Sequence, residues 1–326
     1  FYPLPETAST VLNVLRLRLS ELGCEISCGV YIEQIEKSEN GFLLRLKEKE
    51  RSYQIYADRV ILATGSRAGD FLQNKKEDPL RPARLLGLQS TPLYPSLTKC
   101  ICREDHYYRQ LAGVRAQVVL KLFCAENRSE EIRRESGELQ LTKEGISGIA
   151  VFQLSGEIAQ RLAEKRRVIV EINFLPDFPE DKLEEWSKKR LALLPGRNLE
   201  DFFLGVLHKK VLQACLQAEG LRGTTQIPAS AEKDAVMMVC SVIMRAMHFT
   251  TEVTGVSDMR QAQVCRGGLY LSQFDEKLEC RTVPGLFACG EVLNVDGECG
   301  GYNLHFAWAS GHLAGKWAMR RTGSKV

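Results

Sequence analysis

The first part of the chain changes from a helical to a strand-like spacing of its apolar residues. Between Thr7 and Leu22 the apolar positions recur every three or four residues, and Gly23 then ends the pattern. After Gly23 apolar and polar positions alternate as they do in strands. In chain order the pattern predicts one helix, one strand, a hairpin and one buried strand, over residues 7–22, 24–35, 41–57 and 60–63. This order is typical of an α/β unit with a hairpin crossover.

A different pattern follows Leu93, where strand-like alternation comes before a long helical region. Residues 148–165 have helical spacing, and Ser147 stands where the N-cap of that helix is expected. The region 179–247 is helical in pattern, with breaks at Pro195-Gly196, Gly220 and Pro228. Strands are predicted on either side of these helices, over residues 114–123, 137–142, 168–174, 249–256 and 261–264. We therefore expect a small barrel or sheet with a helical addition.

The segment from Thr282 to Ala318 carries the strongest chemical signal. It predicts a buried strand over residues 286–288, a Gly290-Glu291 turn, and a helix that begins near Gly301. Glycines let a backbone come close to a ligand, and a helix N-terminus favours an anionic or electron-rich group. An acid at a strand end adds an acceptor where open α/β sheets bind ligands. The segment predicts a site for a nucleotide-type cofactor, although Glu291 taken alone would fit a capping acid better.

Composition narrows the class of protein. The chain has 326 residues, of which 44% are apolar and 26% charged, as in ordinary globular proteins of two domains. Its net charge of +3 does not by itself indicate nucleic acid, and no apolar run reaches the roughly 18 residues of a membrane span. The 11 cysteines are scattered and lack framework or metal-ligand spacing. This usage favours reduced thiols in a cytoplasmic protein and no metal site.

The closing segment resembles the BaiN/YhiN-type family of NAD(P)- and FAD-dependent flavoproteins. The resemblance is carried by GLFACGE, VDG, GGYN and AWASG, which are residues 285–291, 295–297, 300–303 and 307–311. The run GELQLTKEGISGIAVFQLSG and the opening FYPLPETASTVLNVL are similar to further stretches of the family. The resemblance implies an α/β fold. It consists of a Rossmann-type FAD-binding domain over residues 1–92 and 264–326, with an inserted β-barrel plus helical domain over residues 93–263.

The family begins with a glycine-rich unit that binds the ADP half of FAD, and this chain contains no GxGxxG motif. Phe1 already lies inside a stretch that is similar to the family. We therefore expect the FAD-binding domain to be N-terminally incomplete here, and we expect the chain by itself to retain FAD weakly or not at all.

The resemblance also implies which residues contact FAD. Glu291 would accept a hydrogen bond from the ribityl chain, and the paired glycines would set the helix N-terminus against the flavin. Ile32 would read the adenine edge through its backbone, although it fits a core strand residue as well. The turn after residues 60–63 would lie beside the dinucleotide, although such turns are common. The implied cofactor-binding residues are Ile32, Ala63, Thr64, Gly65, Gly290, Glu291, Gly300, Gly301, Tyr302, Asn303 and Leu304.

The sequence departs from the family near this site. After Gly65 only Gly69 remains where the family has a second glycine-rich stretch. His305 stands where the family usually has glutamine, and we interpret it as a packing histidine, with proton donation at the flavin edge as the alternative. Cys289 and Cys299 flank the site without a CxxC partner, which indicates small buried residues and not a redox pair.

These features predict an FAD-dependent oxidoreductase that passes a hydride through bound flavin, with NAD(P)H or oxygen as its redox partner. One branch of the family is associated with reducing uridine in ribosomal RNA, so a flavin-dependent dihydrouridine synthase is the first alternative. The second is a non-catalytic relic, which the missing glycines favour. The basic clusters have acids nearby, so they do not decide between a small-molecule substrate and RNA. No catalytic residue, substrate or oligomeric state follows from the sequence.

Overall fold

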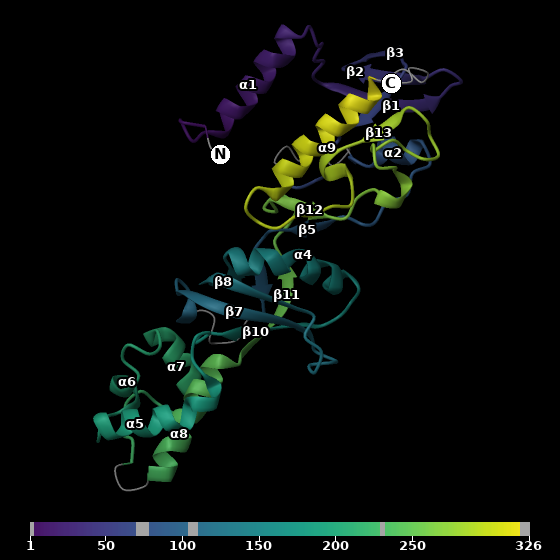
Figure 1. Cartoon of the computed structure of the whole chain (residues 1–326). Coiled ribbons are helices and arrows are strands. Elements are labelled where there is room, and N and C mark those ends of the chain that lie inside the picture. The colour runs from purple at the N-terminus through teal and green to yellow at the C-terminus, as the bar shows by residue number, and fades with distance from the viewer. Residues whose placement is uncertain (1–2, 70–77, 104–109, 229–231, 320–326) are drawn as a thin grey trace.

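The computed structural model describes residues 3–69, 78–103, 110–228 and 232–319 (Figure 1). Three regions follow one another along its length: an α/β region built from the first and last described segments, a barrel, and a group of helices. The barrel and the helices both come from the middle of the sequence. The predicted α/β fold with a barrel and helices between its two parts is confirmed in this arrangement. The exact boundaries after residues 92 and 263 stay a prediction.

The α/β region begins with helix α1 (Ala8–Glu21) and an antiparallel sheet in the order β1-β2-β3. These strands are β1 (Val30–Lys37), β2 (Phe42–Glu48) and β3 (Arg51–Ala57). The prediction of strand over residues 24–29 is wrong. Those residues are exposed, and Gly29 has a φ of +72°, a left-handed conformation that does not continue a strand.

Two short strands from opposite ends of the sequence join in parallel. They are β4 (Val60–Leu62) and β13 (Leu286–Ala288), and Leu62 lies opposite Ala288. Helix α9 (Tyr302–Ala318) packs on both strands, while α2 (Arg81–Leu85) packs on β1. One apolar core holds these parts together; its fully or nearly fully buried members include Phe42, Leu62, Leu80, Leu269, Leu286 and Val292. The first and last parts of the chain therefore form one body.

The chain leaves this body and returns to it through a second pair of strands. These are β5 (Tyr94–Ser96) and β12 (Val264–Arg266), which pair antiparallel. Figure 1 shows the pair between the α/β region and the barrel. Two short 3-10 turns, Leu271–Gln273 and Gly290–Val292 (η2 and η3), follow in the returning segment.

The barrel is closed by six strands in the order β10-β11-β6-β9-β8-β7. Every neighbouring pair is antiparallel. The pairing of β7 with β10 closes the sheet, so the barrel has no open edge. The strands are β6 (Cys100–Cys102), β7 (Arg115–Cys124), β8 (Arg133–Leu141), β9 (Gly145–Ser147), β10 (Val168–Asn173) and β11 (Phe249–Val256).

Helix α4 (Ile149–Ala163) packs on the barrel with a fully buried row that includes Val151, Leu154 and Ile158. The predicted cap at Ser147 is wrong, because the N-cap is Gly148 at a φ of +105°. A Cβ at Gly148 would lie 2.3 Å from the Glu138 carbonyl oxygen, so only glycine fits where β9 turns into α4 beside β8.

The helical group is an excursion between β10 and β11. It consists of η1 (Glu180–Lys182), α5 (Leu183–Leu193), α6 (Leu199–Phe202), α7 (Lys209–Ala218) and α8 (Glu232–Met247). Trp186 meets Phe178 and Phe202 edge to face, with ring centroids 5.2 and 6.4 Å apart. The predicted breaks at Pro195-Gly196 and Gly220 fall between these helices.

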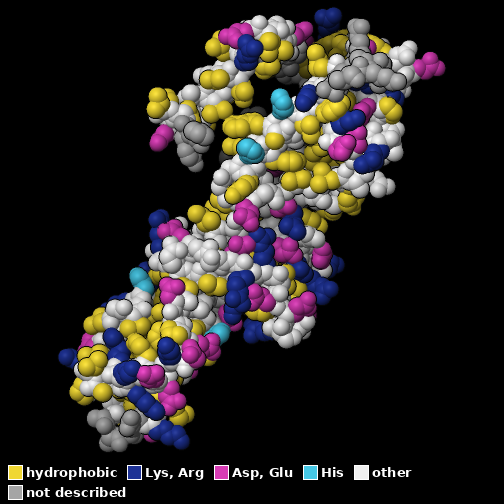
Figure 2. All heavy atoms as spheres, viewed as in Figure 1, with side chains coloured by type: hydrophobic (Ala, Val, Ile, Leu, Met, Phe, Trp, Pro, Cys, Tyr) yellow, Lys and Arg dark blue, Asp and Glu magenta, His cyan; other side chains and the backbone are white. Residues whose placement is uncertain are grey.

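Helix α1 has the predicted helical form, but none of its residues is buried. Its apolar side chains stay exposed, among them Leu12 at 47%, Val14 at 61% and Leu17 at 62%. Figure 2 shows apolar side chains on α1 and on the surface opposite it. In the described part of the chain, no helix combines the length and apolar character needed to cross a membrane.

Candidate cofactor site

The candidate site lies where the parallel strands β4 and β13 end. Both strands point the same way, so the turn Ala63–Gly65 after β4 lies beside the Gly290-Glu291 turn after β13. The Cys289 N–H donates to the Leu62 carbonyl at 3.0 Å and extends the pairing by one residue. The two turns that the sequence singles out, more than 220 residues apart, therefore meet at one edge.

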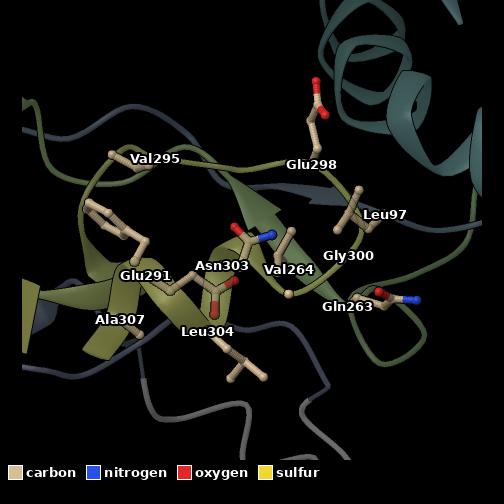
Figure 3. Close-up of a pocket in the computed structure, with 12 residues that line it drawn as sticks. Leu97, Gln263, Val264, Glu291, Val295, Glu298, Gly300, Asn303, Leu304 and Ala307 are labelled. Atoms are coloured by element: carbon tan, nitrogen blue, oxygen red, sulfur yellow. The ribbon is translucent and has the colours of Figure 1, made fainter. Parts of the chain in front are cut away.

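A cavity of about 370 Å³ opens next to this edge (Figure 3). This volume lies within the range of roughly 300–1,000 Å³ that is usual for small-ligand sites. The cavity is lined by Leu97, Gln263, Val264, Glu291, Val295, Glu298, Gly300, Gly301, Asn303, Leu304, Phe306 and Ala307. Five of the predicted residues are brought together here: Glu291, Gly300, Gly301, Asn303 and Leu304.

Glu291 is half-buried and ties two segments together. Its Oε1 accepts a hydrogen bond of 2.7 Å from the Cys265 N–H on β12. A carboxylate has two oxygens, each able to accept more than one bond. The carboxylate is thus oriented by the backbone of the returning strand and still has acceptor capacity toward the cavity it lines.

The glycine turn before α9 has the shape of a backbone cradle. Gly300 and Gly301 have φ values of +122° and +95°, and Gly301 is the N-cap of the helix. A Cβ at Gly301 would meet nothing within 4 Å, and one at Gly300 would meet only the Tyr302 ring, at 3.8 Å. The turn therefore faces open space, in which a ligand can approach the backbone and the positive end of α9.

Asn303 closes the loop that leads to this turn. Its Nδ2 donates to the Gly297 carbonyl at 2.9 Å, and its Oδ1 accepts from the Gly297 N–H at 2.8 Å. A Cβ at Gly297 would lie 3.1 Å from the Tyr302 Cβ, so the loop packs tightly on the first turn of α9. Asn303 lines the cavity, but its amide is used to hold the loop.

Gly290 and the turn 63–65 after β4 are held by hydrogen bonds next to the site. The Gly290 N–H donates to the buried Ser310 Oγ at 2.9 Å, at a φ of +69°. Thr64 Oγ1 donates to the Pro79 carbonyl at 2.7 Å. Gly65 has a φ of +67°, and a Cβ there would meet nothing within 4 Å. Neither Gly290 nor residues 63–65 line the cavity of Figure 3.

Ile32 and Tyr302 also lie outside the cavity lining. The Ile32 carbonyl accepts a hydrogen bond from the Arg81 guanidinium, which also donates to the Glu33 carbonyl at 2.7 Å. One backbone group of Ile32 is therefore already bonded within the protein. Tyr302 is 63% exposed at the start of α9. Part of the segment after Gly69, where the family has more glycines, lies outside the described residues.

The flanking residues correct one interpretation. His305 is exposed, so its interpretation as a packing histidine is wrong. Cys289 is buried as predicted, and burial raises the pKa of its thiol. Cys299 is only half-buried. Among the described residues, no three His, Cys, Asp or Glu side chains form a group that could hold a metal ion.

Sequence reasoning missed the residues that the middle of the chain contributes. Leu97, Gln263 and Val264 line the cavity from the segments that enter and leave the barrel. The short predicted strand at 261–264 is the only sequence signal for these lining residues.

Burial raises the pKa of the Asp296 carboxyl above its ordinary value, and the Arg266 and Arg133 guanidinium groups partly oppose this effect.

Comparisons with known proteins place the chain in a family. The family model described as the HI0933-like protein Rossmann domain matches residues 1–317. A 3-dehydro-bile acid delta(4,6)-reductase of Clostridium scindens is 33% identical over 98% of this chain and 75% of its own length. A ribosomal RNA dihydrouridine synthase of Haemophilus influenzae is 26% identical over 94% of this chain and 72% of its own length. The Escherichia coli protein of the same name is 29% identical, over 85% and 63%. The chain belongs to the HI0933-like Rossmann-domain family.

Proposed function

We propose that this protein is an FAD-dependent oxidoreductase that transfers a hydride through bound flavin. The observation that carries the proposal is the meeting of Glu291 and the Gly300-Gly301 turn around one cavity at the end of a parallel strand pair. Membership of the HI0933-like family and the similarity to a reductase support it. NAD(P)H as donor, or oxygen as acceptor, is the redox partner that we propose.

The residues of the site fit a flavin nucleotide. The open backbone at Gly300 and Gly301 would accept the close approach of a flat ring, and the N-terminus of α9 would favour electron density on its reduced form. Glu291 would accept a hydrogen bond from a hydroxyl of the cofactor. Gly65 and Gly290 would shape the two turns beside it. The flavin supplies the redox chemistry, since it can take up and release a hydride.

The remaining residues of the cavity would orient the reactants and exclude water. Val264, Leu304 and Phe306 give it apolar walls. Leu97 and Gln263 come from the edges of the segment 93–263, which we propose as the inserted domain that selects the substrate. We propose a small molecule as the substrate and the cytoplasm as the place of the reaction.

Anaerobic reduction tests this function. The full-length gene product would be loaded with FAD and mixed with NADPH or NADH under nitrogen, and the flavin absorbance would be followed. Bleaching that saturates with one of the two nucleotides is the expected result. Flavin that stays oxidised with both would exclude NAD(P)H as the donor and leave oxygen as the redox partner to be tested with candidate substrates.

A second candidate is a dihydrouridine synthase that acts on ribosomal RNA. It is favoured by the two relatives of that name, which are 26% and 29% identical to this chain. The reduced protein would be incubated with unmodified ribosomal RNA, and dihydrouridine would be measured after digestion to nucleosides. Its absence under conditions that oxidise the flavin with another acceptor would rule out this candidate. A protein that binds no flavin would instead support the non-catalytic relic.

A further inference from the structure

One face of helix α4 on the barrel carries a polar row toward the candidate site. Gln153, Glu157 and Gln160 are spaced by four and three residues, which places them on the same face of the helix. Gln153 Oε1 accepts a hydrogen bond of 3.0 Å from the Cys299 N–H, in the loop that precedes the glycine turn. The barrel helix α4 therefore contacts the loop 294–300 directly through Gln153.

Arg266 makes the second connection, from the strand β12 at the junction of the two bodies. Its Nε donates to Gln160 Oε1 at 3.1 Å, and its Nη2 lies 3.0 Å from Glu157 Oε2. Its Nη1 lies 3.5 Å from Asp296 Oδ2, in the same loop as Cys299. A planar guanidinium with five N–H donors can serve three acceptors at fixed angles, which an ammonium group cannot do.

The surroundings of Arg266 strengthen this connection. The side chains of Arg266, Glu157 and Asp296 are only 30%, 18% and 20% exposed, so solvent screens their interaction less than that of a surface pair. A Cβ at Gly156 would lie 2.6 Å from Ser96 Oγ and 3.3 Å from Arg266 Cδ. Helix α4 thus packs against β5 and β12 with no spare room.

These contacts fix the loop 294–300 at three points. Asp296 is held by Arg266, Gly297 by Asn303, and Cys299 by Gln153. The next residues are the two glycines whose backbone faces the cavity. Two of the three anchors reach the barrel helix α4, one directly and one through Arg266.

We propose that Gln153 and Arg266 are positioning residues, through which the barrel holds the glycine turn in its ligand-binding conformation. They line no part of the cavity and act through the loop. Because this role assumes that flavin binds at the turn, it rests on the function proposed above. It would make flavin affinity depend on a junction between the two bodies of the protein.

Hydrogen exchange in the flavin-free, full-length protein tests the anchors without relying on function. In Gln153→Ala and Arg266→Ala, amides of the loop 294–300 should exchange on the order of tenfold faster, because each variant removes a loop contact. Amides of β7 and β8 should keep their wild-type rates. Arg245→Ala is the matched control: it breaks a 2.7 Å ion pair with Glu219 in the helical group and should leave the loop unchanged.

Titration with FAD, followed by flavin fluorescence, tests the consequence. Both variants should bind FAD about tenfold more weakly than wild type. Arg266→Lys should restore little, because one ammonium nitrogen cannot replace the three guanidinium nitrogens that each face a different acceptor. Loop exchange at the wild-type rate in both variants would overturn the proposal. If the wild type binds FAD, wild-type FAD affinity in both variants would also overturn it. If the wild type binds no FAD, the proposed function fails, while the exchange rates still decide whether the anchors exist.

Discussion

The side-chain amide of Asn303 forms two hydrogen bonds with the backbone of Gly297. The Gly297 N–H donates to the Asn303 side chain at 2.8 Å, and that side chain donates back to the Gly297 carbonyl at 2.9 Å. This reciprocal pair closes the segment 297–303 onto the first turn of α9. The geometry gives Asn303 a role that the sequence does not reveal: it holds the shape of the turn to which a cofactor would bind.

Replacing this clamp should weaken flavin binding. In Asn303→Ala two hydrogen bonds are lost, at about 1 kcal/mol each, and FAD affinity should fall about tenfold or more. Asn303→Asp keeps the acceptor and loses the donor, so it should lie between Ala and wild type. Fluorescence titration with FAD measures both.

The control for the clamp is another asparagine with a backbone bond. Asn198 caps α6 by accepting from the Asp201 N–H, far from the site. Asn198→Ala should cost about 1 kcal/mol of stability and leave FAD affinity unchanged. Equal FAD affinity in Asn303→Ala and wild type would show that the loop does not need its clamp.

Glu291 should stabilise the fold through the hydrogen bond that its Oε1 accepts. Glu291→Leu leaves the Cys265 N–H without its acceptor, which should cost about 1–3 kcal/mol of unfolding free energy. Glu291→Gln keeps a side-chain oxygen for that N–H, so its loss of stability should stay below about 1 kcal/mol. Urea unfolding measures the two values. Equal losses for Leu and Gln would contradict the role of Oε1 as the acceptor from Cys265.

Asp296 should make stability depend on pH in a defined direction. Burial raises its pKa, so the native state holds the proton more tightly than the unfolded chain does. The stability that this group contributes is full below its unfolded pKa of about 3.9 and is lost as pH rises through the folded pKa. In Asp296→Asn this loss is absent, so the variant should gain stability relative to wild type as pH rises from about 4.

Urea unfolding of both proteins between pH 4 and pH 8 checks this trend. Arg266→Ala gives an internal check, because the cation that opposes the effect of burial is removed. Its pH-dependent loss should extend to higher pH than in wild type. A difference between Asp296→Asn and wild type that stays flat, or has the opposite slope, would contradict the burial of this carboxyl.

Much of the fold could be predicted from local patterns in the sequence. The hairpin of β2 and β3, helices α1, α4 and α9, and the strand β13 all follow from spacing and from glycine positions. The start of β1 could not, because residues 24–29 have a strand-like composition but no partner that buries them in the described structure. Apolar alternation predicts a strand only where a sheet is present to receive it.

The candidate site was predictable where its residues are close in sequence and hidden where packing brings them together. Glu291 lies nine residues before the Gly300-Gly301 turn, and both line the cavity. Arg266 lies in no motif, and the family-like run that contains Gln153 does not reveal its contact. The roles of both residues depend on how α4 packs against β12. Ile32 is a residue that the sequence predicts for the site and that the cavity lining does not include. Its carbonyl accepts a hydrogen bond from Arg81.

The cysteines offer a check of burial that does not involve ligand binding. Cys24 and Cys28 are exposed, whereas burial raises the pKa of Cys215 to about 12. Because the thiolate is the reactive form, iodoacetamide at pH 8 should label the first two and spare Cys215 until the protein is unfolded. Peptide mass spectrometry follows the labelling. Cys215 modified as fast as Cys24 would show that the helical core is open.

The most direct measurement of the central claim is the visible absorption spectrum of the full-length gene product after addition of FAD, for wild type and for Gly300→Val. At a φ of +122°, valine is strained and its side chain would fill the space in front of the turn. Wild type should show the shifted bands of a bound flavin after gel filtration, and Gly300→Val should be colourless. A control, Gly205→Val, replaces a glycine at a φ of +76° in the helical group and should keep its flavin. A colourless wild type, or a Gly300→Val protein as fully loaded as wild type, would contradict flavin binding at this turn.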